Sequence, residues 1–175
     1  MEFDVALGQE ELTERALQLC HLLPLGYRPP CQSSHSFALD SVDSLVRCGI
    51  LVMEELSQPS QCPELLFFLC SLLSVQLRAL SWAIEGLQSL HTPLPESECV
   101  AQLHDCLRDK ARQDRVHHES SSADMARAAV RTLTDLGVLV EVEEGGAVRL
   151  VISDLFQQAE NMDKLHHFIR QFLYN

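Results

Sequence analysis

A short phrase that occurs twice constrains the fold of this chain most strongly. One copy is Leu45-x-x-x-Gly49 followed by the apolar run 50–52, and the other is Leu133-x-x-x-Gly137 followed by the run 138–140. In each copy the glycine can take the left-handed conformation that satisfies the last carbonyls of a helix, and the aliphatic run after it favours a strand. The sequence therefore predicts two helix–glycine–strand units. Such units build winged-helix-like modules, which bind or brace other structures more often than they catalyse.

The composition predicts one domain or two small sub-domains with an acidic surface. The chain has 175 residues, of which 46% are apolar, so it can bury one sizeable core or two small ones. Its net charge is −12, which repels a phosphate backbone and an anionic bilayer. Nucleic acid is therefore not an expected partner.

The cysteines and the start of the chain indicate an intracellular protein. The number of cysteines is odd, and several fall on the apolar side of expected helices, which favours reduced, packed thiols over disulfides. The segment 1–11 carries four acidic residues and no Lys or Arg, so we expect no targeting peptide. The seven cysteines are Cys20, Cys31, Cys48, Cys62, Cys70, Cys99 and Cys106.

Hydrophobic periodicity predicts a mostly α chain, a helical bundle with one C-terminal β-hairpin. The expected caps are Ser34 or Ser36 for the second helix, Ser60 or Cys62 for the long helix that begins at Pro63, and Ser121 or Ser122 for the helix that leads to Gly137. The second helix is expected to bury Leu39, Val42, Leu45 and Val46. The expected helices span about 9–23, 34–48, 63–90, 95–113 and 123–136, with a polar connector over 115–122.

The two units differ in their expected strands. The turn-rich segment 57–62 offers no return strand for the strand 50–54, so the first wing is expected to be absent or very short. In the second unit, strands 138–143 and 147–152 flank Glu144-Gly145-Gly146, whose glycines suit a tight hairpin. We therefore divide the chain into a first unit over 1–60, a helical hairpin over 61–114 and a second unit over 115–175.

Two apolar helices need a place to pack. The stretch 65–84 tempts a transmembrane interpretation, but Gln76 and Arg78 interrupt it, so a buried bundle helix is favoured. A terminal helix, 161–174, is expected to begin at the cap Asn161 and to dock its apolar face within this chain or on another domain. That face consists of Leu165, Phe168, Ile169, Phe172 and Leu173.

Catalytic and metal-binding chemistry is sparse, and we predict no catalytic, cofactor or metal site. The pairs His117-His118 and His166-His167 are sequence neighbours, whose side chains point about 100° apart on a helix and so do not converge on one metal. Neither Cys20 beside His21 nor Cys99 near His104 has the basic surroundings that activate a thiol.

Two matches to the pattern His-x-x-x-x-Asp are the remaining catalytic candidates: His35 with Asp40, and His104 with Asp109. In such a pair the aspartate orients the histidine, which then removes a proton from a hydroxyl. On a helix, residues five apart point away from one another, so the pair in 104–109 is expected to be accidental. Three functions are considered for this chain. Direct catalysis as a hydrolase or transferase that uses His35 and Asp40 is less favoured than the two given below.

An ordered series of segments resembles the carboxyl-terminal region of mitochondrial-type glycerol-3-phosphate acyltransferases. The likeness runs from about Ala6 to the end of the chain. Its segments are 19–24 (LCHLLP), 31–34 (CQSS), 45–52 (LVRCGILV), 62–70 (CPELLFFLC), 133–139 (LTDLGVL) and 164–172 (KLHHFIRQF).

The resemblance implies a role without catalysis. Members of the family carry the catalytic His-x-x-x-x-Asp far upstream, with companion motifs rich in Arg, Phe, Glu and Gly that are missing here, so the role is not transferred to His35 or Asp40. The expected function is to brace the acyltransferase domain of the same parent protein, which moves an acyl chain from acyl-CoA to the sn-1 hydroxyl of glycerol 3-phosphate in glycerolipid and phospholipid synthesis.

The resemblance also implies a place in the cell, the cytosol-facing outer mitochondrial membrane. The chain would reach it only through the parent protein, because no membrane span is expected in this chain.

The alternative function is that of a stand-alone acidic winged-helix-like module that binds protein partners.

Overall fold

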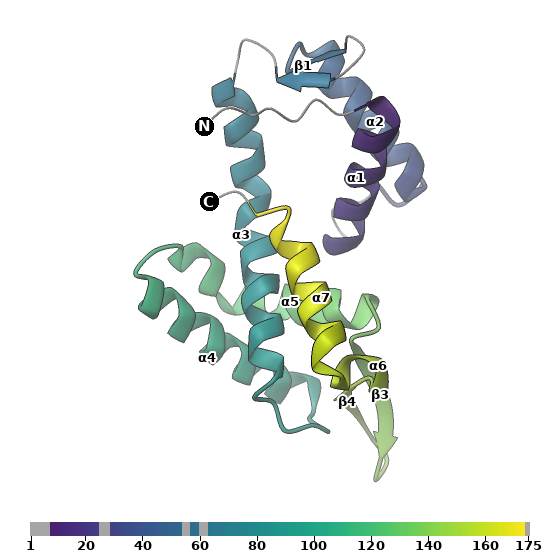
Figure 1. Ribbon diagram of the computed structural model, residues 1–175. Helices are drawn as coiled ribbons and strands as arrows, with labels where there is room; N and C mark the ends of the chain where they lie inside the picture. Colours follow the sequence, from purple (N-terminus) through teal and green to yellow (C-terminus); the bar gives the residue numbers. More distant parts are fainter. Residues whose placement is uncertain (1–7, 25–28, 54–56, 60–62, 174–175) are drawn as a thin grey trace. The chain divides into compact units, whose positions relative to one another are not determined.

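The computed structural model describes residues 8–24, 29–53, 57–59 and 63–173, and the architecture is that of these residues. The chain forms two compact units, Met1–Leu72 and Leu73–Asn175 (Figure 1). The predicted mostly α fold is confirmed. The boundary falls inside helix α3 (Pro63–Leu87), whereas the sequence favoured divisions at residues 60 and 114, and that three-part division stays a prediction.

The first unit pairs helix α1 (Gln9–Leu22) with helix α2 (Ser34–Arg47). Its buried side chains include Leu22, Ala38 and Val42. Leu39 was expected in this core but is 37% exposed, because the buried side of α2 is centred on Ala38 and Val42. The expected caps Ser34 and Ser36 are also wrong: Ser33 caps α2, and its Oγ accepts a hydrogen bond of 3.1 Å from the Ser36 amide.

The first wing is very short. Strand β1 (Leu51–Met53) pairs antiparallel with strand β2 (Ser57–Pro59), so the expectation that 57–62 holds no return strand is wrong for 57–59. Three residues per strand suffice for a ladder but leave little surface to pack. The expected strand residue Glu54 and the expected cap at Ser60 or Cys62 lie outside the described residues.

The core of the second unit lies between α3, helix α4 (Glu96–Asp114) and helix α5 (Ala123–Asp135). Trp82, Leu107 and Ala126 are among its buried side chains. At Gly86 an added Cβ would lie 3.1 Å from the Leu103 side chain, so the missing side chain lets α3 and α4 approach closely. The expected polar connector holds a short 3₁₀ helix, η2 (His118–Ser121), before Ser122 caps α5 as expected.

The second wing is a complete hairpin. Strands β3 (Leu139–Glu144) and β4 (Ala147–Ile152) pair over six residues each. Gly145 and Gly146 both have positive φ, which the tight turn requires. On the other side of β4, Leu94 and Leu150 exchange two backbone hydrogen bonds of 3.0 and 2.7 Å. The spatial order is therefore Leu94, β4, β3.

Both predicted helix–glycine–strand junctions are confirmed, and they share one geometry. Gly49 and Gly137 have φ of 69° and 70°. After each glycine, the next amide bonds back to the leucine five residues earlier, Ile50 to Leu45 and Val138 to Leu133, at 2.9 Å in both copies. This is the Schellman motif, in which a left-handed residue ends the helix and satisfies its last carbonyls.

The terminal helix begins earlier than expected. A short helix, α6 (Asp154–Gln157), precedes helix α7 (Ala159–Arg170). The predicted cap Asn161 is wrong: Gln158 is the N-cap, and the side-chain amide of Asn161 instead donates to the carbonyl of Leu155 at 2.8 Å. The side chain of Asn161 therefore ties α7 to α6. Tyr174, the expected last residue of the helix, lies outside the described residues.

Candidate functional site

A polar cluster fastens α7 to two other helices of the second unit. His166 on α7 places its Nε2 atom 2.8 Å from Ser81 Oγ and 3.2 Å from Glu85 Oε1, both on α3. The other carboxylate oxygen of Glu85 accepts from Lys110 Nζ on α4. Beside the cluster, Met162 and Ile169 of α7 are buried. Of the apolar face expected to dock, Ile169 is buried, and the remaining residues are half-buried: Leu165, Phe168, Phe172 and Leu173.

The residue types in this cluster are those of a serine–histidine–acid triad, but their geometry is different. In a triad the acid holds Nδ1 while the serine hydroxyl meets Nε2. Here Ser81 and Glu85 both approach Nε2 of His166, so the carboxylate cannot orient the ring toward the hydroxyl. Ser81 is also buried. The arrangement joins α7 to α3, and its geometry is not that of a catalytic triad.

A second charged group lies at the junction between α4 and α5. Arg78 on α3 is only 6% exposed, and burial lowers the pKa of its guanidinium, while the charges of Glu119 and Asp114 act in the opposite direction. The pKa of Glu119 is lowered, first by a backbone hydrogen bond and further by His117. Arg78 on α3 thus interacts electrostatically with Asp114 at the end of α4 and with Glu119 of the connector.

The backbone of this junction takes an unusual conformation. Arg115 and His117 both lie in the left-handed region, with φ of 57° and 61°. His117 Nδ1 lies 3.3 Å from Glu119 Oε1. Left-handed conformations at residues other than glycine cost free energy and persist where the surroundings hold them. The expected polar connector 115–122 is therefore a structured turn, and its Glu119 interacts electrostatically with Arg78.

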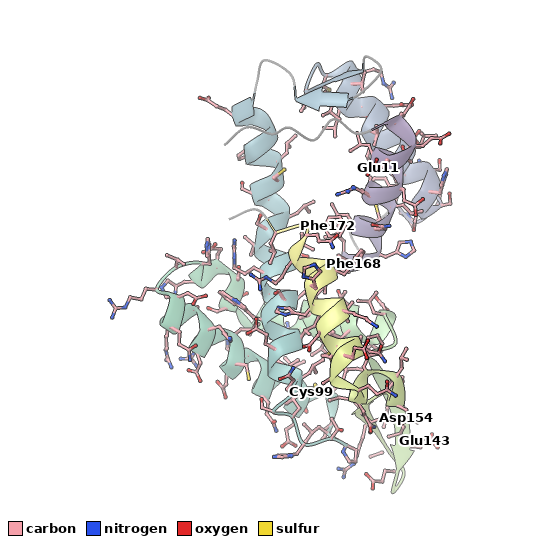
Figure 2. The ribbon with its side chains drawn as sticks, viewed as in Figure 1. Glu11, Cys99, Glu143, Asp154, Phe168 and Phe172 are labelled. Carbon is pink, nitrogen blue, oxygen red and sulfur yellow. The ribbon has the colours of Figure 1, made fainter. Side chains whose placement is uncertain are left out.

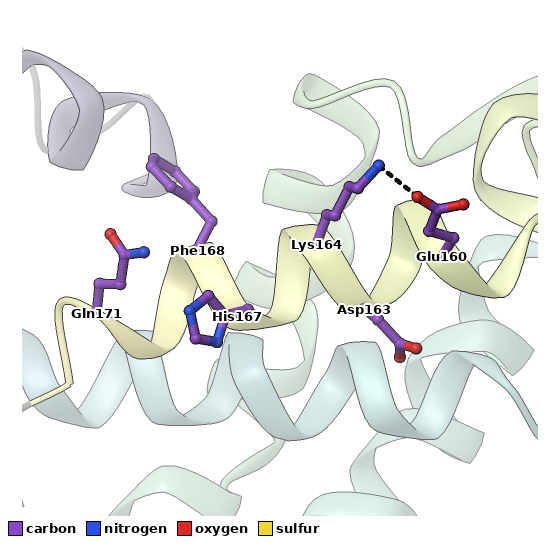
Figure 3. A pocket seen from close by; sticks show the side chains of 6 residues that line it. All are labelled: Glu160, Asp163, Lys164, His167, Phe168 and Gln171. Carbon is purple, nitrogen blue, oxygen red and sulfur yellow. Dashed lines mark hydrogen bonds and ion pairs between the residues drawn. The ribbon is translucent and has the colours of Figure 1, made fainter.

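The outward side of α7 carries a shallow hollow of about 360 Å³ (Figure 3). Lys164 and Glu160 form an ion pair of 2.7 Å along it, and Phe168, half-buried, packs edge-on against Phe172 with ring centroids 5.4 Å apart. Figure 2 labels both rings. The lining residues of the hollow are Glu160, Asp163, Lys164, His167, Phe168 and Gln171.

The two His-x-x-x-x-Asp candidates are not brought together. His35 and Asp40 are exposed on α2, and Asp40 accepts from Gln32 rather than from His35. On α4, Asp109 pairs with Arg112 at 3.3 Å, not with His104. Both pairs lie within helices, where a separation of five residues turns the side chains apart.

The six cysteines that the structure describes differ in exposure. Cys20 and Cys99 are buried, and burial, with a smaller effect of Glu96, raises the pKa of Cys99 to about 11. Burial also raises the pKa of Cys70. Within the described ranges, no three His, Cys, Asp or Glu side chains gather as a metal site would need.

The apolar stretch of α3 has the length and composition of a membrane span over Phe68–Leu87. Half of that segment is buried in the protein, where Leu77, Ile84 and Leu87 belong to the core of the second unit. A core helix of a soluble domain passes the same test of length and composition. The absence of a membrane span therefore stays a prediction, and burial of the helix supports it.

Sequence reasoning missed the two clusters that the fold assembles. Ser81 and His166 are 85 positions apart, and no local spacing connects them. A partial signal was present for Arg78, an arginine inside an otherwise apolar helix, because a charged residue in such a helix requires a partner.

Comparison with known proteins identifies the family. The family model described as "Glycerol-3-phosphate acyltransferase C-terminal region" matches residues 4–142. The chain is 32% identical to human mitochondrial glycerol-3-phosphate acyltransferase 2 over 95% of its own length and 27% of the relative's, and 32% identical to the mouse protein. It is 24% identical to bovine mitochondrial glycerol-3-phosphate acyltransferase 1 over 93% of its length.

This chain covers only part of its relatives, and the human relative has residues in the matched region that this chain lacks. The chain spans about a quarter of the length of these curated relatives. The alignment with the human relative extends over 213 positions, more than the 175 residues of the chain, so within the matched region that relative has residues that this chain lacks. Because the family model covers well over half of the chain, the protein belongs to the family of glycerol-3-phosphate acyltransferase C-terminal regions.

Proposed function

We propose that this chain is a non-catalytic region that braces the acyltransferase domain of a glycerol-3-phosphate acyltransferase. Family membership supports the link to glycerolipid synthesis. The observation that carries the non-catalytic part is the use of His166: this histidine meets Ser81 and Glu85 through one nitrogen and so holds α7 to α3. The charged side chains around it are likewise engaged in joining helices.

The reaction itself belongs, in this proposal, to the acyltransferase domain of the parent protein. That domain transfers an acyl chain from acyl-CoA to the sn-1 hydroxyl of glycerol 3-phosphate, a step of phospholipid synthesis. The partner of the chain is this domain, and the net charge of −12 disfavours nucleic acid as a partner. The names of the relatives support a mitochondrial location, which we place at the cytosolic face of the outer membrane.

A complementation experiment tests the proposal. Human glycerol-3-phosphate acyltransferase 2, truncated to remove the quarter that this chain matches, is mixed with the purified chain, and binding is measured by calorimetry together with the melting temperature of the truncated protein. We expect binding, a higher melting temperature, and no transfer from acyl-CoA to glycerol 3-phosphate by the chain alone.

Two results contradict it. Turnover by the chain alone that disappears in His35→Ala would make the chain an enzyme. If the truncated protein is folded but does not bind the chain, the bracing role is disproved. Asp105→Ala, an exposed change on α4, serves as the matched control for His35→Ala because it alters neither His-x-x-x-x-Asp pair.

The order of elements in the second unit favours one alternative. The unit runs through a helix, the paired residue Leu94, two further α-helices and a hairpin, with Leu94 against the last strand, and this order supports a winged-helix-like module. A stand-alone acidic winged-helix module would bind other proteins and not the truncated acyltransferase. Calorimetry with the truncated protein therefore separates the two functions.

A further inference from the structure

At two glutamates on the outer edge of strand β3, the backbone groups point away from β4. Leu150 directs its N–H and C=O to Leu94, so Leu150 and its opposite residue on β3, Glu141, form a pair that is not hydrogen-bonded to each other. In an antiparallel ladder the N–H and C=O of such a residue point away from the neighbouring strand. Glu141 therefore presents both groups to the free edge of the sheet.

The same alternation continues along the strand. Val138 at the start of the ladder accepts from the Ser153 amide at 2.9 Å, which places the inward-facing residues at even numbers along β3. Glu143, opposite Val148, is therefore also turned outward. Among the described residues, no backbone group bonds to the N–H or C=O of Glu141 or Glu143 from this side. Figure 2 labels Glu143 on the hairpin.

The side chains beside this edge determine which strand could join it. Glu141 and Glu143 are exposed and, two residues apart, lie on the same face of the sheet. Val148, 55% exposed, lies opposite Glu143 on that face. Acidic side chains at an edge disfavour pairing with a second copy of β3, because the glutamates of the two copies would then face each other.

We propose that the edge of β3 at Glu141 and Glu143 is a docking site for an extended protein segment with lysine or arginine at alternate positions. The segment adds a strand to the series Leu94, β4, β3 through the outward N–H and C=O groups, and its cations lie opposite the two glutamates. This site does not depend on the bracing function, because it is defined by the ladder and its charges alone.

A synthetic peptide, acetyl-Val-Lys-Val-Lys-Val-Thr-amide, tests the site on the full chain labelled with ¹⁵N. We expect the amide resonances of Glu141 and Glu143 to shift on titration and their hydrogen exchange to slow. The matched probe is the same peptide with both lysine amides N-methylated, which keeps the charges and removes the donors that would face β3. It is expected to bind at least about tenfold more weakly.

Charge variants complete the experiment. Glu141→Lys/Glu143→Lys is expected to weaken binding of the unmodified peptide about tenfold, because two attractive cross-strand pairs become repulsive. Asp105→Lys/Asp109→Lys on α4, with the same change of net charge, should leave the dissociation constant within about twofold. The dispersion of the amide spectrum verifies the fold of each variant.

Equal binding of the N-methylated peptide would reduce the interaction to general electrostatics and overturn the proposal. So would equal losses in the two double variants, or shifts that fall outside the hairpin.

Discussion

The two helix–glycine–hairpin units have the same type of junction between helix and strand, but the strands that follow it differ in length. Gly49 and Gly137 stop their helices with the same backbone conformation and the same hydrogen bond of 2.9 Å across it. The first junction leads to strands of three residues and the second to strands of six, with Leu94 paired on the far side. A helix stop is thus a local property of a few residues, whereas the length of a wing depends on the turn and on distant partners.

The largest expected difference between the units concerns the leucine that begins each repeated phrase. Leu133 is fully buried and Leu45 only partly, so Leu133→Ala should cost about 3 kcal/mol and Leu45→Ala about 1 kcal/mol of unfolding free energy. Urea titrations measure both, with the fluorescence of the single tryptophan, Trp82, reporting on the second unit and circular dichroism on the whole chain. Equal losses would show that the two units have equally packed cores.

The glycines should behave alike where the leucines do not. Gly49→Val and Gly137→Val each force a β-branched residue into the left-handed region, at about 1–3 kcal/mol. An added Cβ meets nothing within 4 Å at either position, so the cost is conformational and similar in both units. Thermal melts measure it, and Gly→Asn variants, which tolerate this conformation, should lose less. A cost at only one glycine would break the equivalence of the junctions.

The helix caps offer a smaller comparison. Ser33 and Ser122 each accept a hydrogen bond from the amide three residues on, at 3.1 and 3.2 Å. Replacing either by alanine should cost about 1 kcal/mol. Ser153 stands at the start of α6 without such a bond, so Ser153→Ala is the control and should change stability by less than about 0.5 kcal/mol. Urea titrations measure the unfolding free energy of all three variants. If Ser153→Ala lost as much stability as the two cap variants, the capping role of Ser33 and Ser122 would be disproved.

The smallest expected effect is a pH dependence of the unfolding free energy that arises from Cys99 in the second unit. Burial raises the pKa of Cys99 from 9.0 to about 11, so the unfolded chain ionises this thiol first and stability falls as pH rises from about 9 to about 11. Between pH 8 and 9.5 we expect a loss of less than about 1 kcal/mol. Cys99→Ala should remove that part of the slope, and Cys48→Ala in the first unit, where the thiol is exposed, should not. If the unfolding free energy fell with pH at the same slope in both variants, the assignment of this pH dependence to Cys99 would be refuted.

The parts of the fold that depend on neighbouring residues could be read from the sequence. The helix stops at Gly49 and Gly137, the tight turn at Gly145 and Gly146 and the cap at Ser122 each need only a few residues in a fixed order. The same reasoning failed where a local choice had competitors: Ser33 rather than Ser34 or Ser36 caps α2, and Asn161 bonds to Leu155 instead of capping α7.

The contacts between distant segments could not be read in this way. The return strand 57–59 lacks the β-branched alternation that marks a strand and forms because β1 lies beside it. The Ser81–His166 contact and the position of Arg78 near Glu119 arise only when three helices have packed. The expectation of no metal or catalytic site came from the spacing of histidines, cysteines and aspartates along the chain, and such spacing says nothing about residues that meet only in the fold.

The pairing of Leu94 with Leu150 bears on the order in which the second unit forms. The two residues stand on either side of α4, α5 and β3, so their hydrogen bonds close a long loop that must first become compact. Contacts of such long range tend to form late in folding, after the helices and the hairpin have joined. A change that weakens this pair should therefore speed unfolding and leave the folding rate nearly unchanged, making Leu94 a determinant of how long the second unit stays folded.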